Sequence, residues 1–141
     1  MNTLYRNPIA HSVRTFDLWS IVGDLSWRFE WAFRKHDMAF DGHFPKQALL
    51  PGVFLMEMAE RAALFALERS GSPGWHLSRI ERFRFAKPIT PGENCCLTLQ
   101  FPNQQSLASG PLRIAAAFDS TGNRVATGTL VMDLADDHER I

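Results

Sequence analysis

Apolar and polar residues alternate across residues 26–33. Trp27, Phe29, Trp31 and Phe33 fall on one side of an extended segment, and most of the charged residues between them fall on the other. Because successive side chains of a β-strand point to opposite faces, this period of two predicts a half-buried strand. Its aromatic face is expected to belong to the core or to an interface.

The next regular segment has the composition of a helix. It follows Pro51, is rich in Leu, Met, Ala, Glu and Arg, and has Val53 as its one β-branched residue. These features predict a helix from about Gly52 to Arg69, which the Gly and Pro residues of the stretch 70–74 bring to an end. Because this helix is apolar nearly all round, it is expected to be buried.

Four segments after the helix have strand patterns and are separated by turn-forming residues. In the second of them Cys95 and Leu97 share one face, and Cys96 and Thr98 share the other. The last two flank Thr121-Gly122-Asn123, which predicts a hairpin. The expected strands cover residues 77–89, 95–101, 112–120 and 124–134.

This order of elements predicts an α+β protein, in which a curved antiparallel sheet wraps around one long central helix. With 141 residues, the chain is expected to form a single domain over residues 1–141. The N-terminal segment, residues 1–24, has no clear pattern, although residues 16–25 suit a short helix or a packed loop. Residues 135–141 form a polar tail that is expected to fray.

Composition narrows the functional classes. Lys+Arg and Asp+Glu both total 15, so the net charge is zero and nucleic-acid binding has no electrostatic basis. No apolar run is long enough for a membrane span, and the N-terminus lacks the apolar core of a signal peptide. The adjacent Cys95 and Cys96 form no disulfide framework, so a cytoplasmic location is expected. Metal-ligand spacing is absent around the histidines at 11, 36, 76 and 138, so no metal site is expected.

One carboxylate interrupts the apolar helix. Glu57 stands 14 residues after His43, which lies between Gly42 and a Phe-Pro pair. Taken singly, His43 suits a structural histidine, and Glu57 suits an i,i+4 salt bridge with Arg61. Taken together, an imidazole that titrates near neutrality and a partly desolvated carboxylate suit an acid/base pair.

The stretch GHFPKQALLPGVFLMEMA resembles the signature of the hotdog-fold 3-hydroxyacyl-[acyl-carrier-protein] dehydratases. That signature has a Gly-His-Phe-Pro start, a Pro-Gly-Val helix opening and an acidic residue 14 positions after the histidine. All three are present, at Gly42–Pro45, Pro51–Val53 and Glu57. A second match, IERFRFAKPITPGE at residues 80–93, extends the resemblance over about residues 25–134.

The resemblance implies a reaction and a role for each residue. Dehydrating a 3-hydroxyacyl thioester needs a base for the α-proton, an acid for the β-hydroxyl and a donor for the thioester oxygen. His43 would be the base and Glu57 the acid/base partner for the hydroxyl. The Gly52 N–H, at the positive end of the helix, would hold the oxygen, and the Leu49 carbonyl would steady the His43 ring.

The resemblance also implies partners. In an obligatory homodimer, His43 of one subunit would face Glu57 of the other across an apolar acyl tunnel, and a higher oligomer or heteromer stays open. The substrate would arrive on the phosphopantetheine of an acyl carrier protein, with no further cofactor. Candidates for the tunnel or the core are Phe44, Phe54, Met56 and Met58. Candidates for carrier-protein contact, if they are not a solvated strand face, are Lys46, Arg79, Arg82, Arg84 and Lys87.

Two residues depart from the family pattern. Arg61 stands where the family usually has Gln, and a paired arginine favours an ionised Glu57, opposite to the need of a general acid. Arg61 would instead orient the carboxylate or contact a polar substrate group. Ala48 stands where the family often has Pro. This replacement is expected to loosen the loop after His43. The short N-terminal segment is similar to relatives in polyene or polyketide assembly.

The expected function is therefore dehydration of (3R)-3-hydroxyacyl-carrier-protein thioesters in fatty-acid or polyketide and polyene synthesis. A hotdog thioesterase is an alternative against which the His-Phe-Pro loop argues. An enoyl isomerase would use the same two residues, His43 and Glu57. A protein of another class, a non-catalytic partner that binds the acyl carrier protein in a synthase complex, would result if Arg61 disabled the pair.

Overall fold

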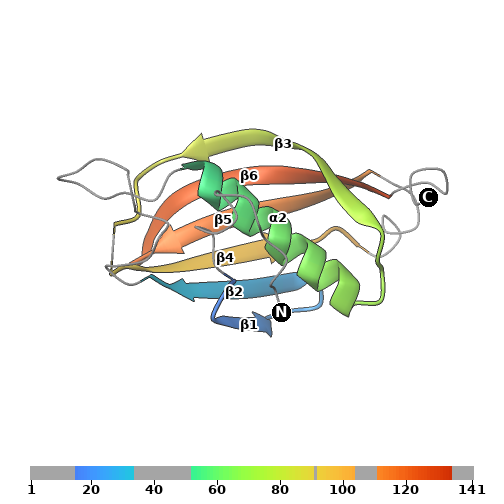
Figure 1. The fold of residues 1–141 in the computed structure, drawn as a ribbon, viewed down its shortest axis with the longest axis horizontal. Helices are drawn as coiled ribbons and strands as arrows, with labels where there is room; N and C mark the ends of the chain where they lie inside the picture. The colour runs from blue at the N-terminus through green and yellow to red at the C-terminus, as the bar shows by residue number, and fades with distance from the viewer. Residues whose placement is uncertain (1–14, 34–51, 91, 104–110, 135–141) are drawn as a thin grey trace.

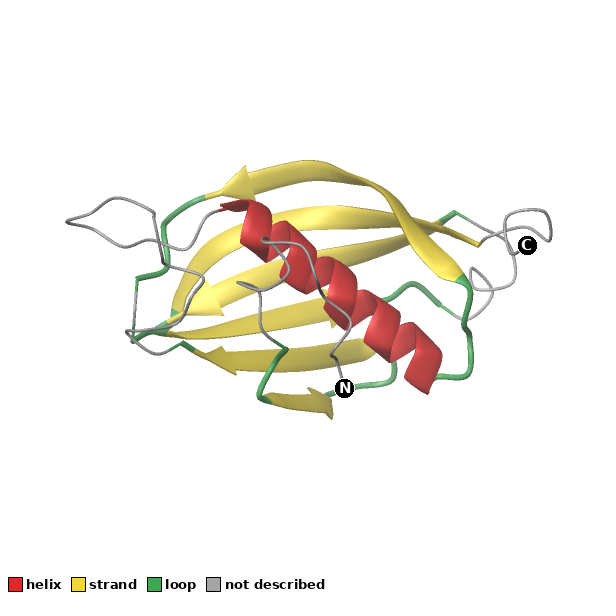
Figure 2. Ribbon diagram, viewed as in Figure 1, coloured by secondary structure: helices red, strands yellow, loops and turns green. Residues whose placement is uncertain are grey.

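One long helix lies across one face of a six-stranded antiparallel sheet (Figures 1 and 2). The computed structural model describes residues 15–33, 52–90, 92–103 and 111–134. The strand order is β1-β2-β4-β5-β6-β3, and the strands curve around the helix (Figure 1). The elements are β1 (Leu18–Ile21), β2 (Ser26–Ala32), α2 (Gly52–Arg69), β3 (Trp75–Phe85), β4 (Asn94–Gln100), β5 (Leu112–Ser120) and β6 (Asn123–Leu134).

The helix has the predicted bounds, Gly52–Arg69. At its end the Ser72 N–H donates to the Leu67 carbonyl and the Gly71 N–H to the Glu68 carbonyl. Gly71 has a φ of 84°, the left-handed conformation in which such a cap usually places glycine. Within the described part of the chain, no helix is long and apolar enough to cross a membrane.

The core lies between α2 and the inner face of the sheet. The aromatic face of β2 and the Cys95–Leu97–Leu99 face of β4 are buried, which confirms the predicted alternation. On the helix, the side facing the sheet carries four buried alanines, whose small side chains let the helix approach the large residues opposite. These alanines are Ala59, Ala62, Ala63 and Ala66.

The burial of α2 differs from the prediction, because among the described residues only its sheet-facing side is buried. Val53 is 52% exposed, and Leu64 and Phe65 are partly exposed. The other side of the helix is therefore partly open and includes exposed apolar residues.

The prediction of a short helix or loop at residues 16–25 is wrong, because this region contains the strand β1. Leu18 pairs with Glu30 and Ile21 with Trp27 at the edge of the sheet. All four residues of β1 are exposed, so no alternation of apolar and polar positions marks it in the sequence. Pairing with β2, and stacking of Trp19 on Trp27 at 5.4 Å between ring centroids, hold it instead.

Strand β3 starts and ends earlier than predicted and contains a bulge. Glu81 pairs with Thr129 and Arg84 with Thr127, so two residues of β3 oppose the single Gly128 of β6. The bulge lets Ile80 and Phe83 both pack against the core, although three positions separate them. Gly128 leaves room here, because a Cβ at this position would lie 3.1 Å from Phe83 Cδ1, a tighter contact than most Cβ atoms make.

The predicted hairpin between β5 and β6 has a shorter loop than expected, because Asn123 already pairs with Ser120. Thr121 and Gly122 both have positive φ, 51° and 80°, as a type I′ loop requires. Glycine adopts this conformation easily, whereas a β-branched threonine does not.

We expect Thr121→Asn to raise the free energy of unfolding by about 1 kcal/mol, because asparagine tolerates the left-handed conformation. Thermal unfolding followed by circular dichroism should show a rise in Tm of roughly 3 °C. Thr98→Asn, on the regular strand β4, is the matched control and should lower the Tm. A Thr121→Asn variant no more stable than wild type would contradict the expectation.

Candidate active site

The structure describes one half of the predicted acid/base pair. His43, Phe44, Lys46 and Leu49 lie outside the described residues, as does Ala48, so the convergence of His43 and Glu57 remains a prediction. The described half lies on α2, which presents Gly52, Glu57 and Arg61.

Gly52 is the first residue of α2, as predicted. The first backbone N–H groups of a helix have no partner within the helix and lie at the positive end of its dipole, so they suit an oxyanion. A Cβ on Gly52 would lie 3.8 Å from Phe85 Cδ1, an ordinary contact. The described protein residues therefore do not require glycine here, and the need for close approach would come from a bound acyl group.

Glu57 and Arg61 form the i,i+4 ion pair that their spacing suggested. Arg61 Nη2 donates to Glu57 Oε2 at 2.5 Å. The side chains are 28% and 16% exposed, so the pair is largely removed from solvent. The pair engages one carboxylate oxygen, and Glu57 Oε1 accepts no hydrogen bond from the described residues.

The helical period places Glu57 on the side of α2 opposite the sheet-facing alanines. Val53 precedes it by one turn and Leu64 follows it by two, so the carboxylate lies on an apolar ridge. This ridge is the partly open side of the helix.

Glu60 is a second carboxylate on this side of α2, which the sequence reasoning did not single out. Partial burial raises its pKa, the nearby charge of Glu57 raises it further, and Arg61 opposes both effects. The spacing could have indicated this cluster, since Glu57, Glu60 and Arg61 lie at i, i+3 and i+4 on a largely apolar helix.

Of the predicted tunnel residues, Phe54 and Met58 are buried in the core and Met56 is partly buried. All three lie within one turn of Glu57 on α2. Packing against the core fixes the helix at the level of the carboxylate.

The second matched motif ends in a structural carboxylate. Glu93 accepts hydrogen bonds from Thr90 Oγ1 at 2.6 Å and from the buried Ser120 Oγ at 2.8 Å. The Glu93 N–H also donates to the Thr90 carbonyl, which closes the turn. Glu93 therefore ties the turn before β4 to the end of β5.

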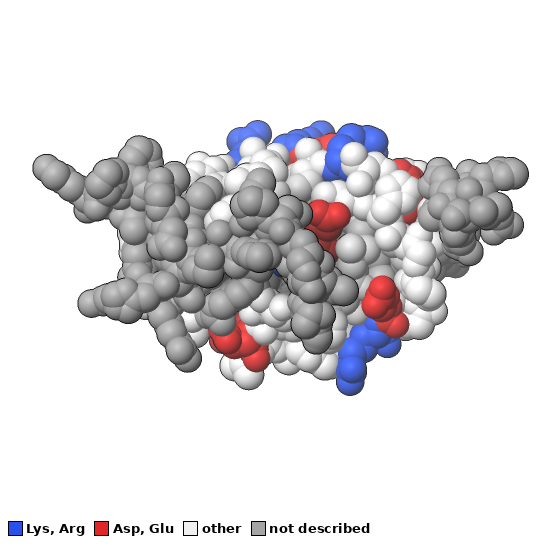
Figure 3. All heavy atoms as spheres, viewed as in Figure 1, with Lys and Arg blue, Asp and Glu red and all other residues white. Residues whose placement is uncertain are grey.

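Three of the predicted carrier-protein contacts, Arg79, Arg82 and Arg84, lie on β3, and basic side chains line that edge of the molecule (Figure 3). Arg79 is paired with Glu81 at 2.8 Å, and Glu81 also accepts from Arg113. Arg82 and Arg84 are exposed and have no ion pair or side-chain hydrogen bond within the described residues. Lys87, just beyond the strand, is partly buried.

Comparison with known proteins shows the family to which this chain belongs. The family model described as ApeI dehydratase, of the ApeI-like type, matches residues 21–123, well over half of the chain. This chain belongs to the ApeI-like dehydratase family. The likeness to 3-hydroxyacyl-[acyl-carrier-protein] dehydratases that the motif suggested is thereby confirmed at the level of the family.

Curated relatives of this ApeI-like protein include 3-hydroxyacyl-[acyl-carrier-protein] dehydratases named FabZ. The one from Aliivibrio fischeri is 34% identical over 67 residues, which cover 44% of this chain and 45% of the relative. The one from Yersinia enterocolitica is 29% identical over 97 residues, covering 65% and 56%. The matches thus span about half the length of these relatives.

Solved structures confirm the predicted hotdog fold. The dehydratase heterocomplex ApeI:P from Xenorhabdus doucetiae superimposes with a TM-score of 0.61 at 21% identity, covering 83% of this chain and 95% of that one. A hypothetical thioesterase with coenzyme A from Streptococcus pneumoniae gives 0.64 at 10% identity, covering 86% and 88%. At these identities the likeness shows the fold alone, which dehydratases and thioesterases share.

We expect Glu60→Gln to unfold at a higher temperature than wild type at pH 7. Because the folded-state pKa of Glu60 is raised, its contribution to stability is present at acid pH and is lost as the pH rises through that pKa. The neutral glutamine avoids this loss, so the difference in Tm should shrink as the pH falls toward about 4.

Thermal unfolding at a series of pH values measures this difference. Glu68→Gln, at the exposed end of the same helix, is the matched control and should show a much smaller effect. A Glu60→Gln variant whose change in Tm does not depend on pH would contradict the assignment.

Proposed function

We propose that this ApeI-like protein dehydrates (3R)-3-hydroxyacyl thioesters of an acyl carrier protein to trans-2-enoyl thioesters, in fatty-acid or polyketide and polyene synthesis. The observation that carries the proposal is the placement of Glu57. It is a largely desolvated carboxylate, one and a half turns from the backbone donor Gly52 on the same rigid helix. Family membership and the sequence motif around His43 are the further support for the proposal.

In the proposed reaction, His43 removes the α-proton, and the electron pair moves onto the thioester oxygen, which accepts a hydrogen bond from the Gly52 N–H. When the carbonyl re-forms, the bond from the β-carbon to the hydroxyl oxygen breaks. Glu57 gives its proton to that oxygen, so water leaves and the enoyl thioester remains. A proton then passes from His43 to Glu57 through solvent and restores both groups.

Arg61 is a positioning residue in this scheme. Its hydrogen bond to Oε2 restrains the carboxylate and leaves Oε1 to carry the proton. The same bond also supports the competing function, a non-catalytic partner that binds the acyl carrier protein, because an arginine that holds the carboxylate competes with its contact to a substrate hydroxyl.

The apolar ridge around Glu57 supports a homodimer. Val53 is 52% exposed one turn before the carboxylate, and an exposed apolar strip beside a functional group is suited to cover by another subunit. In the proposed dimer, His43 of one subunit faces Glu57 of the other. A heteromeric assembly would cover the same ridge.

Mass spectrometry of a 3-hydroxyacyl-carrier-protein after incubation tests the reaction, and we expect the loss of one water. His43→Ala and Glu57→Gln should each lower kcat at least about a hundredfold, because each removes one proton transfer. The matched controls His76→Ala and Glu68→Gln change exposed residues of the same types and should stay within twofold of wild type. Arg61→Gln should lower kcat with little change in KM.

Other outcomes would replace the proposal. Release of the free acid would indicate a thioesterase, and movement of the double bond in an added enoyl thioester would indicate an isomerase. Binding of the carrier protein without turnover would indicate the non-catalytic partner. Turnover by His43→Ala or Glu57→Gln within a few-fold of wild type would refute the acid/base pair.

Mixing the two inactive variants tests the shared site. After unfolding and refolding together, His43→Ala and Glu57→Gln subunits should form heterodimers in which one of the two sites has both groups. Such a mixture should recover about a quarter of wild-type activity if subunits pair at random. Recovery no greater than the sum of the separate variants would show that both residues of a site come from one subunit.

A further inference from the structure

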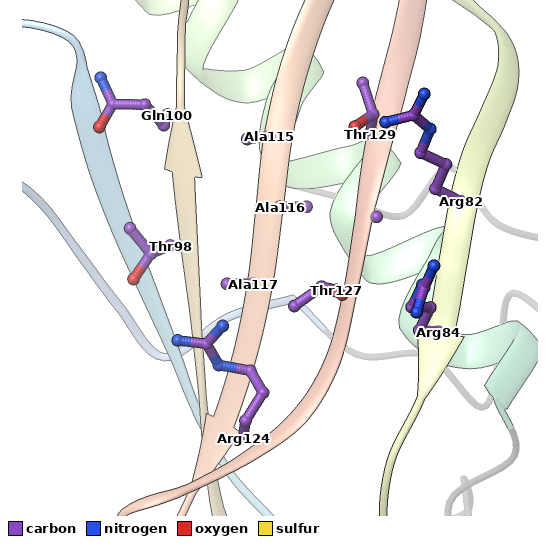
Figure 4. A pocket seen from close by; sticks show the side chains of 11 residues that line it. Arg82, Arg84, Thr98, Gln100, Ala115, Ala116, Ala117, Arg124, Thr127 and Thr129 are labelled. Atoms are coloured by element: carbon purple, nitrogen blue, oxygen red, sulfur yellow. The ribbon is translucent and has the colours of Figure 1, made fainter.

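A hollow of ≈ 490 Å³ lies on the face of the sheet that α2 does not cover. Its floor is formed by Ala115, Ala116 and Ala117 of β5, and its walls come from β4, β6 and β3 (Figure 4). Arginine side chains stand on the β3 side and at one end, and polar uncharged side chains complete the rim. The arginines are Arg82, Arg84 and Arg124, and the uncharged polar residues are Thr98, Gln100, Thr127 and Thr129.

The bulge of β3 brings Arg82 and Arg84 to the same wall. Arg82 has a φ of 55°, a left-handed conformation that few non-glycine residues adopt. With this kink, Phe83 packs toward the core over Gly128, while the residues on either side of it line the hollow. A regular strand could not place Ile80 in the core and Arg82 and Arg84 in the hollow, because residues two apart share a face.

Some of the arginines around the hollow are paired with acidic residues, and others are not paired within the described residues. Arg124 Nε is paired with Asp119 Oδ1 at 2.6 Å, and Glu81 accepts from both Arg79 and Arg113 on the same face of the sheet. Arg82 and Arg84 have no such partner within the described residues. The described residues that line the hollow include no Asp or Glu, so the hollow carries a local positive charge although the chain as a whole is neutral.

We infer that this hollow binds a phosphate group, held by the guanidinium groups of Arg82 and Arg84 with the hydroxyls of Thr127 and Thr129 as further donors. Guanidinium groups form paired, charge-assisted hydrogen bonds to phosphate oxygens, and hydroxyl groups complete such sites. The volume is ample for a phosphate with an organic group attached.

The phosphate could belong to a free anion or to the prosthetic arm of a carrier protein. Phe85, next to Arg84, faces the start of α2 at Gly52, and β3 is the last strand of the sheet. The hollow is thus one edge strand away from the helix start. The prosthetic arm of a carrier protein would pass around that edge. The arm as the source of the phosphate rests on the proposed function, whereas the phosphate site itself does not.

Isothermal titration calorimetry at physiological salt tests the site with four probes: inorganic phosphate, pyrophosphate, 4′-phosphopantetheine and pantetheine. Wild type should bind at least one phosphate-bearing probe and should not bind pantetheine. The double variant Arg82→Gln/Arg84→Gln should raise Kd at least tenfold. Glutamine meets the same backbone constraint as arginine at position 82, so strain is matched.

Arg79→Gln/Arg113→Gln is the control variant, because it removes the same charge from the same face outside the hollow. Its Kd should stay within twofold of wild type. Circular dichroism checks that each variant is folded. If the double variant is not folded, Arg84→Gln alone replaces it, with an expected rise of several-fold in Kd.

Absence of binding by wild type, unchanged binding by the double variant, or an equal loss in the control variant would each overturn the site. Equal Kd values for phosphate and 4′-phosphopantetheine would identify a free anion as the ligand, and tighter binding of 4′-phosphopantetheine would identify the arm. Because no turnover is measured, failure of the dehydration assay leaves this result independent.

Discussion

The packing of the alanine-lined side of α2 against the inner face of the sheet is the interaction on which the rest of the structure depends. Ala59, Ala62 and Ala66 allow the helix to lie close to strands whose inward residues are large. This contact fixes the rotation of the helix about its axis. Glu57 is then forced to the opposite side, together with Glu60 and Arg61, because a charge facing the sheet would have no partner there.

A carboxylate in this position has conflicting requirements. In the proposed reaction it must be held firmly enough to act on a substrate, and the ion pair with Arg61 restrains one of its oxygens. The same ion pair leaves Oε1 without a hydrogen bond from the described residues, and Glu60 lies on the same side of the helix. Both Glu57 and Arg61 act on the charge of Glu60, so Arg61 in place of the usual Gln changes the surroundings of both carboxylates.

The parts of the fold that depend on a regular period could be predicted from the sequence. The bounds of α2, the aromatic face of β2 and the alternation at Cys95–Leu99 each follow from local repetition over several turns or residue pairs. Strand β1 could not be predicted, because its residues are all exposed, and pairing with β2 and the ring contacts of Trp19 order them. The His43–Glu57 spacing indicated a site, yet spacing alone cannot say whether the two side chains meet within one subunit or between two.

The bulge of β3 shows why the sequence identifies the basic residues but does not reveal which of them are paired with an acidic residue. In the sequence, Arg79, Arg82 and Arg84 lie close together, and nothing distinguishes them as candidates for contact with a carrier protein. In the fold, Glu81 pairs with Arg79, whereas Arg82 and Arg84 line one wall of a hollow beside the kink. Neither of these two has an ion pair within the part of the chain that the structure describes. Gly128, which lies on another strand, leaves room for Phe83 at that kink. The place of each arginine therefore depends on pairing with strands distant in the sequence, a relation that only the strand register reveals.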